Sequence, residues 1–425
     1  MVTTTTASFR SLFAVRDFTV LWIAGTQSQV GDQLGRVALS ILVFDRTGSG
    51  LATAATYALT YLPAVAGGIF LTGLADTLPR RSLLVICDIL RAGLFALMAI
   101  RSTPLWLVCV LLVVAVLAGS PYNAAEPALV ADIFEGDHYV AANGLRTATT
   151  QCAQLAGFAG GGVIVAVTGP HTALFIDALT FAASAVLLRV GLMLRSAAST
   201  GDRPRGFAHI MLGIRTVSSS RQLRTLLAFA WLYAWWVIPE GLAAPYAAAH
   251  GGGPTSVGVL LAAGPAGNVL GVLVLTRWLP SSKRPQLLGG LAIVTGIPLI
   301  LCGLGPGIAW AAVLWGLCGF FGAYVVLVVT EFVAVVPSRV RGQAIGLASA
   351  GLLAAQGVGL LIGGLIAAVW AVTPAIAVAG VVGSALAVPL ALSRRRTGRH
   401  RTAPVAVAYS PASGSAETSR PVSAP

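Results

Sequence analysis

Two acidic side chains interrupt long apolar runs of this 425-residue chain. Asp32 lies near the middle of an apolar run at 18–43, and Arg36 follows one helical turn later on the same face. Glu240 comes directly after Pro239 in a later run. An ionisable side chain at the centre of a bilayer costs about 2.5–3.5 kcal/mol on insertion scales, so each acid is a candidate for handling a proton or binding a polar molecule.

The surroundings of Asp32 leave two interpretations open. Asp32, Arg36 and the neighbouring Gln33 would line a central cavity and form a proton or substrate site. Alternatively, the two opposite charges neutralise each other and serve only structure. Asp177 lies in another apolar run, at 171–194, and either role is open for it as well.

Aromatic residues precede the second acid, since Trp235 and Trp236 stand shortly before Glu240. A proline inside a helix frees backbone groups and produces a kink. An acid beside aromatic rings suits a cavity for cationic or amphipathic molecules. Alternatively, the aromatic residues form an interfacial belt and Glu240 lies near the outer surface.

A second group of charges lies in the stretch from Gly73 to Arg91, GLADTLPRRSLLVICDILR, between two apolar runs. Its charged members are, in chain order, Asp76, Arg80, Arg81, Asp88 and Arg91. We expect Asp76 to cap a helix N-terminus. We expect the arginines to pair with Asp88 and with Glu126 or Asp132, so that the network latches one conformation. The simpler alternative is that the arginines only follow the positive-inside rule.

The composition, 56% hydrophobic and only 10% charged, excludes an ordinary soluble protein, which carries roughly 25% charged residues. A helix that spans a bilayer needs about 20 apolar residues. Twelve such runs are predicted, at 18–43, 49–74, 82–101, 104–126, 140–168, 171–194, 223–247, 255–278, 286–304, 307–330, 342–368 and 371–392. We therefore expect an all-α integral membrane protein with twelve transmembrane helices.

The arginines predict the orientation. If both termini are cytoplasmic, the loops on the outer side hold only Arg46 and Arg101. In the longest loop, apolar residues at helical spacing predict a short amphipathic helix on the membrane surface: Phe207, Ile210, Met211, Ile214 and Val217. The predicted parts are an N-terminal segment (1–17), a first six-helix bundle (18–194), this linker (195–222), a second bundle (223–393) and a disordered basic tail (394–425).

Motifs of catalysis are missing from the sequence. It contains no G-x-x-x-x-G-K-[ST], G-x-S-x-G or H-E-x-x-H motif, and its five cysteines and five histidines lack metal-ligand spacing. We expect no enzyme, no catalytic residues, no metal and no cofactor. The net charge of +13 comes mostly from arginines at the ends of apolar runs, which favours anionic membrane lipids as partners and not nucleic acid.

Several motifs resemble those of the major facilitator superfamily. GLADTLPRR resembles the signature of the loop after the second helix, and the following DILRA resembles the branch that exports drugs, macrolides and enterobactin. Further motifs that agree with this branch are GDQLGRVALSILVFDRTGS, NAAEPALVADI, LFIDALTF and RGQAIGL. The resemblance covers roughly residues 8–392. It departs at Thr77, where the family often has arginine, and at GFAGGG (157–162), which lacks the Gly-Pro pair common in antiporters.

The resemblance implies two pseudo-symmetric six-helix bundles that transport by alternating access. We expect a monomer in the cell membrane that exports small amphipathic molecules, such as drugs, macrolides or siderophores, by antiport with protons. Asp32 and Glu240 are the expected proton carriers, and the network around Asp76 would hold the outward-open state. The alternatives are an importer or uniporter of the same fold and a non-transporting membrane sensor or scaffold.

Overall fold

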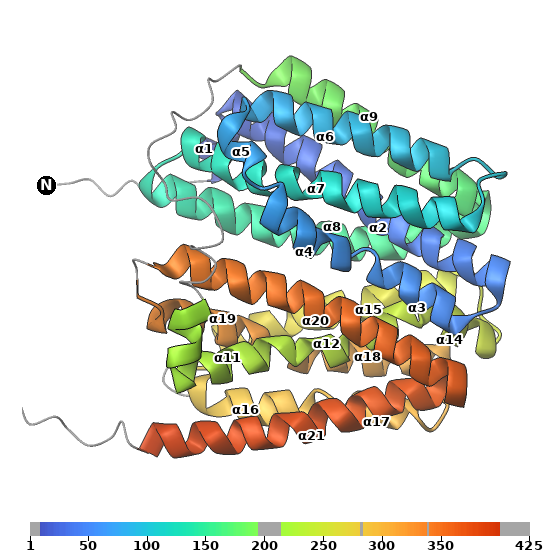
Figure 1. Ribbon diagram of the computed structural model, residues 1–425, viewed down its shortest axis with the longest axis vertical. Helices are drawn as coiled ribbons and strands as arrows, with labels where there is room; N and C mark the ends of the chain where they lie inside the picture. Colours follow the sequence, from blue (N-terminus) through green and yellow to red (C-terminus); the bar gives the residue numbers. More distant parts are fainter. Residues whose placement is uncertain (1–8, 194–213, 281–283, 338–339, 400–425) are drawn as a thin grey trace, which may run out of the picture.

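The chain folds into two bundles of helices that lie side by side (Figure 1). The computed structural model describes residues 9–193, 214–280, 284–337 and 340–399. In these ranges every regular element is a helix. The all-α membrane architecture expected from the composition is therefore confirmed.

Six helical rods, some of them broken, form each bundle. The first bundle contains α2 (Arg16–Thr47), α3 (Gly50–Ala58) with α4 (Leu62–Phe70), α6 (Arg80–Met98), α7 (Leu105–Ile133), α8 (Gly136–Thr168) and α9 (Pro170–Gly191), together with the short α1 (Phe9–Phe13) and α5 (Leu74–Thr77). The second contains α11 (Arg221–Trp231), α12 (Tyr233–Trp236), α13 (Ile238–Gly241) and α14 (Ala243–Ala249) as one rod, then α15 (Pro254–Arg277), α16 (Arg284–Val294) with α17 (Ile297–Cys302), α18 (Ile308–Gly322) with α19 (Tyr324–Val335), α20 (Arg341–Trp370) and α21 (Val372–Arg399).

These rods correspond to the twelve predicted spans, but they are not equally apolar. Within the described residues, seven helices are long and apolar enough to cross a membrane, and a bent pair raises the number to eight. The remaining rods fall short for physical reasons. α2 and α6 carry ionisable residues such as Asp32 and Arg91, and α3–α4 and α16–α17 are broken into shorter helices.

The bent rod is the one that carries Glu240. Arg221–Gly241 and Ala243–Ala249 meet at an angle of 44°. The break follows Pro239, which has no N–H for the helical ladder. Ser220 caps the start of this rod, because its side chain accepts a hydrogen bond from the backbone N–H of Leu223.

The molecule has two unlike ends. We call the end where α2, α6, α11 and α20 begin the basic end, because each of these helices begins with an arginine there (left in Figure 1). At the other, opposite end the connections are tight. Gly48 ends α2 with φ 62°, a left-handed conformation that glycine adopts at little cost.

The two bundles touch closely near the opposite end. A methyl group added to Gly162 of α8 would lie 2.7 Å from the Cα of Gly258 of α15. Similarly, one added to Gly364 of α20 would lie 2.8 Å from Cβ of Ala54 of α3. Small residues therefore let helices of different bundles approach to backbone contact at this end.

The structure describes part of the predicted linker helix and part of the predicted tail. Residues 214–219 are helical, and Val217 is buried in the core; the other positions of the predicted amphipathic helix, except Ile214, lie outside the described residues. α21 continues to Arg399, so the tail predicted to be disordered from 394 begins as helix. An ion pair between Arg394 and Glu331, at 2.5 Å, ties this part of α21 to α19. Residues 400–425 lie outside the described part.

Candidate functional site

A cavity of about 130 Å³ lies between the two bundles. The residues that line it include Gln151 and Gln154 of α8 and, from the second bundle, Tyr233, Trp236, Glu240, Leu261, Asn268 and Trp315. On their helices, Gln154 and Leu261 lie closer to the basic end than the Gly162–Gly258 contact does. The cavity is therefore on the basic-end side of the point where the bundles close. Its wall combines aromatic rings, amides and one carboxylate.

Glu240 connects this cavity to the first bundle. Its Oε2 accepts a hydrogen bond from the hydroxyl of Tyr57 at 3.1 Å and another from the hydroxyl of Tyr61 at 3.4 Å. Tyr57 belongs to α3, and Tyr61 precedes α4 by one residue, about one helical turn further on. One carboxylate thus lines the cavity and holds two side chains of the other bundle.

Arg36 of α2 contacts the second of these tyrosines, Tyr61. Its Nη1 donates a hydrogen bond to the hydroxyl of Tyr61 at 3.4 Å, and its Cζ lies 5.2 Å from the centroid of the same ring. A cation that donates to a hydroxyl strengthens the bond that this hydroxyl donates onward. Arg36, Tyr61 and Glu240 therefore form one polar chain across the boundary between the bundles.

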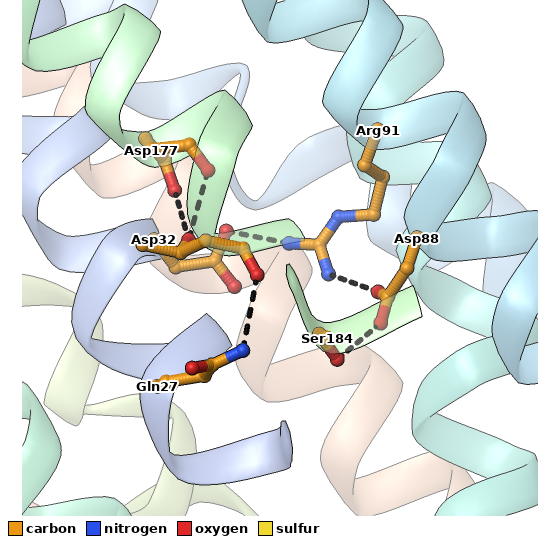
Figure 2. A network of polar contacts seen from close by, with 7 residues as sticks. Gln27, Asp32, Asp88, Arg91, Asp177 and Ser184 are labelled. Carbon is orange, nitrogen blue, oxygen red and sulfur yellow. Dashed lines mark hydrogen bonds and ion pairs between the residues drawn. The ribbon is translucent and has the colours of Figure 1, made fainter. Parts of the chain in front are cut away.

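A second polar group lies inside the first bundle, around Arg91 (Figure 2). The guanidinium of Arg91 donates to Oδ1 of Asp32 at 2.5 Å and lies 4.0 Å from Oδ1 of Asp88. Oδ2 of Asp88 accepts a hydrogen bond from the hydroxyl of Ser184 at 2.5 Å. The ring of Phe181 covers the guanidinium, with its centroid 3.9 Å from Cζ. Helices α2, α6 and α9 thus meet around one cation.

Asp177 belongs to the same group and is fully buried. The hydroxyl of Thr180 donates to its Oδ1 at 3.3 Å, and among the described residues its Oδ2 has no hydrogen-bond partner. Asp177 also interacts electrostatically with Asp32 and Arg91. Gly31 of α2 makes room for it, because a methyl group there would lie 2.5 Å from Oδ1.

The structure corrects the interpretation that Asp32 and Arg36 neutralise each other as a pair. Within the described residues the ion-pair partner of Asp32 is Arg91, and Arg36 turns instead to Tyr61. Neither residue is among those that line the cavity described above. Spacing along one helix does not reveal a partner on another helix, and α6 supplies that partner here.

Other predicted cavity residues divide into two groups. Trp236 lines the cavity and donates a hydrogen bond from Nε1 to the hydroxyl of Tyr324 at 3.3 Å. Trp235 is half-buried and is not part of the lining. Gln33 packs against Gly157 of α8 and is also not part of the lining.

Two ion pairs expected for the stretch from Gly73 to Arg91 are present, Arg91 with Asp88 and Arg80 with Asp132. Arg80 also donates to the carbonyl oxygen of Ala128 at 2.7 Å. Arg81 bonds instead to a backbone carbonyl, that of Arg189 in α9. The arginines therefore tie α6 to α7 and α9 within the first bundle.

The turn that begins this stretch packs mainly on the first bundle. α5, which begins directly after Gly73, makes its main contacts with α6 and α7 of its own bundle. The side chain of Asp76 lies outside what the structure describes, so its capping role stays a prediction.

Glu126 and Glu331 occupy corresponding rods of the two bundles and are both paired. Glu126 binds Arg146 of α8 at 3.1 Å, not one of the arginines of the stretch from Gly73 to Arg91. Glu331 binds Arg394 at 2.5 Å and accepts a hydrogen bond from Gln222 at 3.4 Å. An arginine of a neighbouring helix therefore neutralises the acid in each bundle, and Arg146 was not predicted from the sequence.

Tyr57, Tyr61 and Ser184 were also missed by the sequence analysis. A signal existed for the tyrosines, because two hydroxyls about one turn apart in an apolar span must find partners when they are buried. Ser184 gave none, since small polar residues are common where membrane helices pack.

Two six-rod bundles around a polar cavity define a multi-pass membrane transporter. Residues 11–239, more than half of the chain, match the sequence profile of the Major Facilitator Superfamily, and the chain belongs to that family. It is similar to the uncharacterized MFS-type transporter YkuC of Bacillus subtilis (strain 168), with 27% identity over 183 residues. That match spans 42% of the length of each protein.

Solved structures show the same fold over nearly the whole chain. A POT family transporter in complex with 5-aminolevulinic acid superposes with a TM-score of 0.71 at 11% identity, covering 92% of this chain and 98% of the other. A bacterial homolog of the human lysosomal transporter Spinster, in an inward-facing and unoccupied conformation, gives 0.68 at 12% identity, covering 90% and 97%. At such identities the likeness shows the fold alone.

Proposed function

We propose that this transporter exports small amphipathic cations in exchange for protons. The observation that carries the proposal is the double role of Glu240, which lines the cavity and accepts hydrogen bonds from Tyr57 and Tyr61 of the other bundle. A molecule bound at this carboxylate competes with the contact between the bundles. Binding is thereby coupled to the rearrangement that transport requires.

The chemistry of the cavity supports this class of substrate. Trp236, Tyr233 and Trp315 offer ring faces and apolar surface, Gln151 and Asn268 offer amides, and Glu240 is the carboxylate in the lining. Aromatic faces attract cations. An amine or guanidine attached to an apolar body satisfies all of these groups, and such molecules include many drugs.

Protons would be carried by the acids. In the first bundle, Asp32, Asp88 and Asp177 surround one arginine, Arg91. Asp88 and Asp177 are fully buried and Asp32 is partly exposed, and the three carboxylates share one cation. The excess negative charge is removed by a bound proton. We assign Asp32 and Glu240 as the proton carriers. Asp32 is ion-paired with Arg91, and Glu240 lines the cavity in which the substrate would bind. One proton crossing about 100 mV contributes about 2.3 kcal/mol, and each pH unit adds about 1.4 kcal/mol.

We assign the basic end to the cytoplasm by the positive-inside rule. The chain would then be a monomer in the cell membrane with both termini inside, and the arginines of that end would contact anionic lipids. Because the bundles close near the opposite end, the structure would be the inward-facing state. The ion pairs of Arg80 and Arg91 are formed in it, so they do not require the outward-open state assigned to them from the sequence.

Proteoliposomes test the proposal. Protein is reconstituted with an imposed pH gradient and assayed with a fluorescent lipophilic cation, comparing the wild type with Asp32→Asn, Glu240→Gln and the double variant. We expect substrate counterflow to survive in Asp32→Asn while proton-driven accumulation is lost, and both to fall in Glu240→Gln. Proton-driven transport that is unchanged in all three variants would overturn the assignment. Accumulation that follows inward proton flow would identify a symporter or importer.

A further inference from the structure

The fold brings together the two arginines predicted for the loops of the opposite end. Arg46, in the last turn of α2, donates from Nη1 to the carbonyl oxygen of Thr103 at 2.7 Å and from Nη2 to that of Arg101 at 3.1 Å. Nη2 also lies 3.4 Å from Nε2 of His171, in the first turn of α9. Three segments far apart in the chain thus place basic side chains in one spot.

The positive charge of this group rests on its arginines. Nδ1 of His171 lies 3.1 Å from the carbonyl oxygen of Ala99, and a carbonyl only accepts, so Nδ1 carries the proton. Nε2 then accepts from Arg46. His171 is therefore neutral and orients Arg46. Asp45 directly precedes Arg46 in the chain, but among the described residues it forms no ion pair with Arg46 or Arg101.

An open hollow of about 340 Å³ lies beside this group. Arg101, His171 and Thr172 form its polar side. Ile100 and Phe175, each 49% exposed, form its apolar side. Among the described residues, the exposed guanidinium of Arg101 has neither a hydrogen bond nor an ion pair from its side chain. The hollow therefore offers an unpaired cation next to bare apolar surface.

We infer that this hollow binds an anionic phospholipid, with its phosphate against Arg101, near the positive charge of Arg46, and an acyl chain along Ile100 and Phe175. An arginine pairs well with phosphate oxygens, and two nearby cations without an acidic partner favour a bound anion. A free phosphate would satisfy the charge but leave the exposed ring of Phe175 uncovered. Because the end of a membrane-spanning helix lies at headgroup level, charged and apolar sides match a lipid in position as well as in chemistry.

Lipid titration of the purified full-length protein in detergent tests this inference, with bound molecules counted by native mass spectrometry. The probes are dioleoylphosphatidylglycerol, dioleoylphosphatidylcholine and inorganic phosphate. The phosphatidylglycerol molecule that binds most tightly to the wild type should bind about tenfold more weakly to Arg101→Gln. This is the expected effect of losing one charge-assisted contact. Phosphatidylcholine binding should not change, and Arg101→Lys should keep most of the affinity.

Two further variants locate the site. Phe175→Ser removes an exposed ring. It should weaken the binding of phosphatidylglycerol and leave the binding of inorganic phosphate unchanged. Arg215→Gln removes an exposed arginine of the linker and should not change the affinity of the most tightly bound phosphatidylglycerol. Wild-type affinity for phosphatidylglycerol in Arg101→Gln would overturn the inference. So would inorganic phosphate that binds as tightly as the lipid and is insensitive to Phe175→Ser, because the hollow would then be a free-anion site. If Arg101→Gln does not fold, the affinities of Arg101→Lys and Phe175→Ser for phosphatidylglycerol test the inference instead.

Discussion

The hydroxyl of Tyr57 donates a hydrogen bond to Oε2 of Glu240 across the boundary between the bundles, with 3.1 Å between the oxygens. Glu240 also faces the cavity. A ligand shifts a conformational equilibrium only by its differential affinity for the two states. The shared carboxylate supplies such a difference, because a cation bound there weakens the hold of Tyr57 and Tyr61 on the second bundle.

Removing the two hydroxyls should open the opposite end. A hydrogen bond to a charged group contributes about 1.5–3 kcal/mol, so Tyr57→Phe with Tyr61→Phe should raise the open population about tenfold or more. Spin labels on Thr168→Cys and Thr255→Cys, at the facing ends of α8 and α15, report this opening by their distance distribution in protein whose five native cysteines are replaced by alanine. Tyr139→Phe is the control, because the hydroxyl of Tyr139 has no hydrogen bond among the described residues. An unchanged distribution in the double variant would show that the tyrosines do not hold the bundles together.

Arg91 should be the most sensitive charged residue of the first bundle. Arg91→Met leaves Asp32 and Asp88 without their cation, and breaking a buried pair in this way costs about 3–5 kcal/mol. The midpoint of thermal unfolding in detergent should therefore fall strongly. Adding Asp32→Asn should recover part of the loss, since one stranded charge is removed. Losses that simply add in the double variant would contradict the pairing.

Long-range partners limit what could be predicted from this sequence. Apolar run length located the twelve rods, because a bilayer demands about 20 such residues, and Pro239 marked the bent rod. Asp132 was one of two acids predicted to pair with an arginine of the stretch from Gly73 to Arg91, because both groups lie at ends of apolar runs on the same predicted side of the membrane. It pairs with Arg80. In contrast, Tyr57 meets Glu240 across 183 positions, and nothing in the local pattern specifies which faces of two bundles will meet.

The contact between Gly162 and Gly258 gives a steric test of the closed opposite end. A side chain at Gly162 would clash with backbone atoms of α15. No change of side-chain rotamer in α15 could relieve this clash. Gly162→Leu should therefore hold the bundles apart at that end and lower transport about tenfold or more, with the spin-label distance between Thr168→Cys and Thr255→Cys lengthened. Gly160→Leu is the matched control, because a side chain there meets open space. Equal transport in both variants would mean that the bundles need not close there.

Asp76→Asn tests the latch assigned to the stretch from Gly73 to Arg91. α5 makes its main contacts with its own bundle, and we expect Asp76 to act as a cap in the state whose basic end is closed. The variant should therefore keep its abundance, its topology and the spin-label distances of the resting protein. Its turnover in proteoliposomes should fall below about a tenth of the wild-type rate, because one state of the cycle loses about 1.5–3 kcal/mol of stabilisation. Normal turnover in Asp76→Asn would leave Arg80 and Arg81 as membrane anchors that hold α6 to α7 and α9, and nothing more.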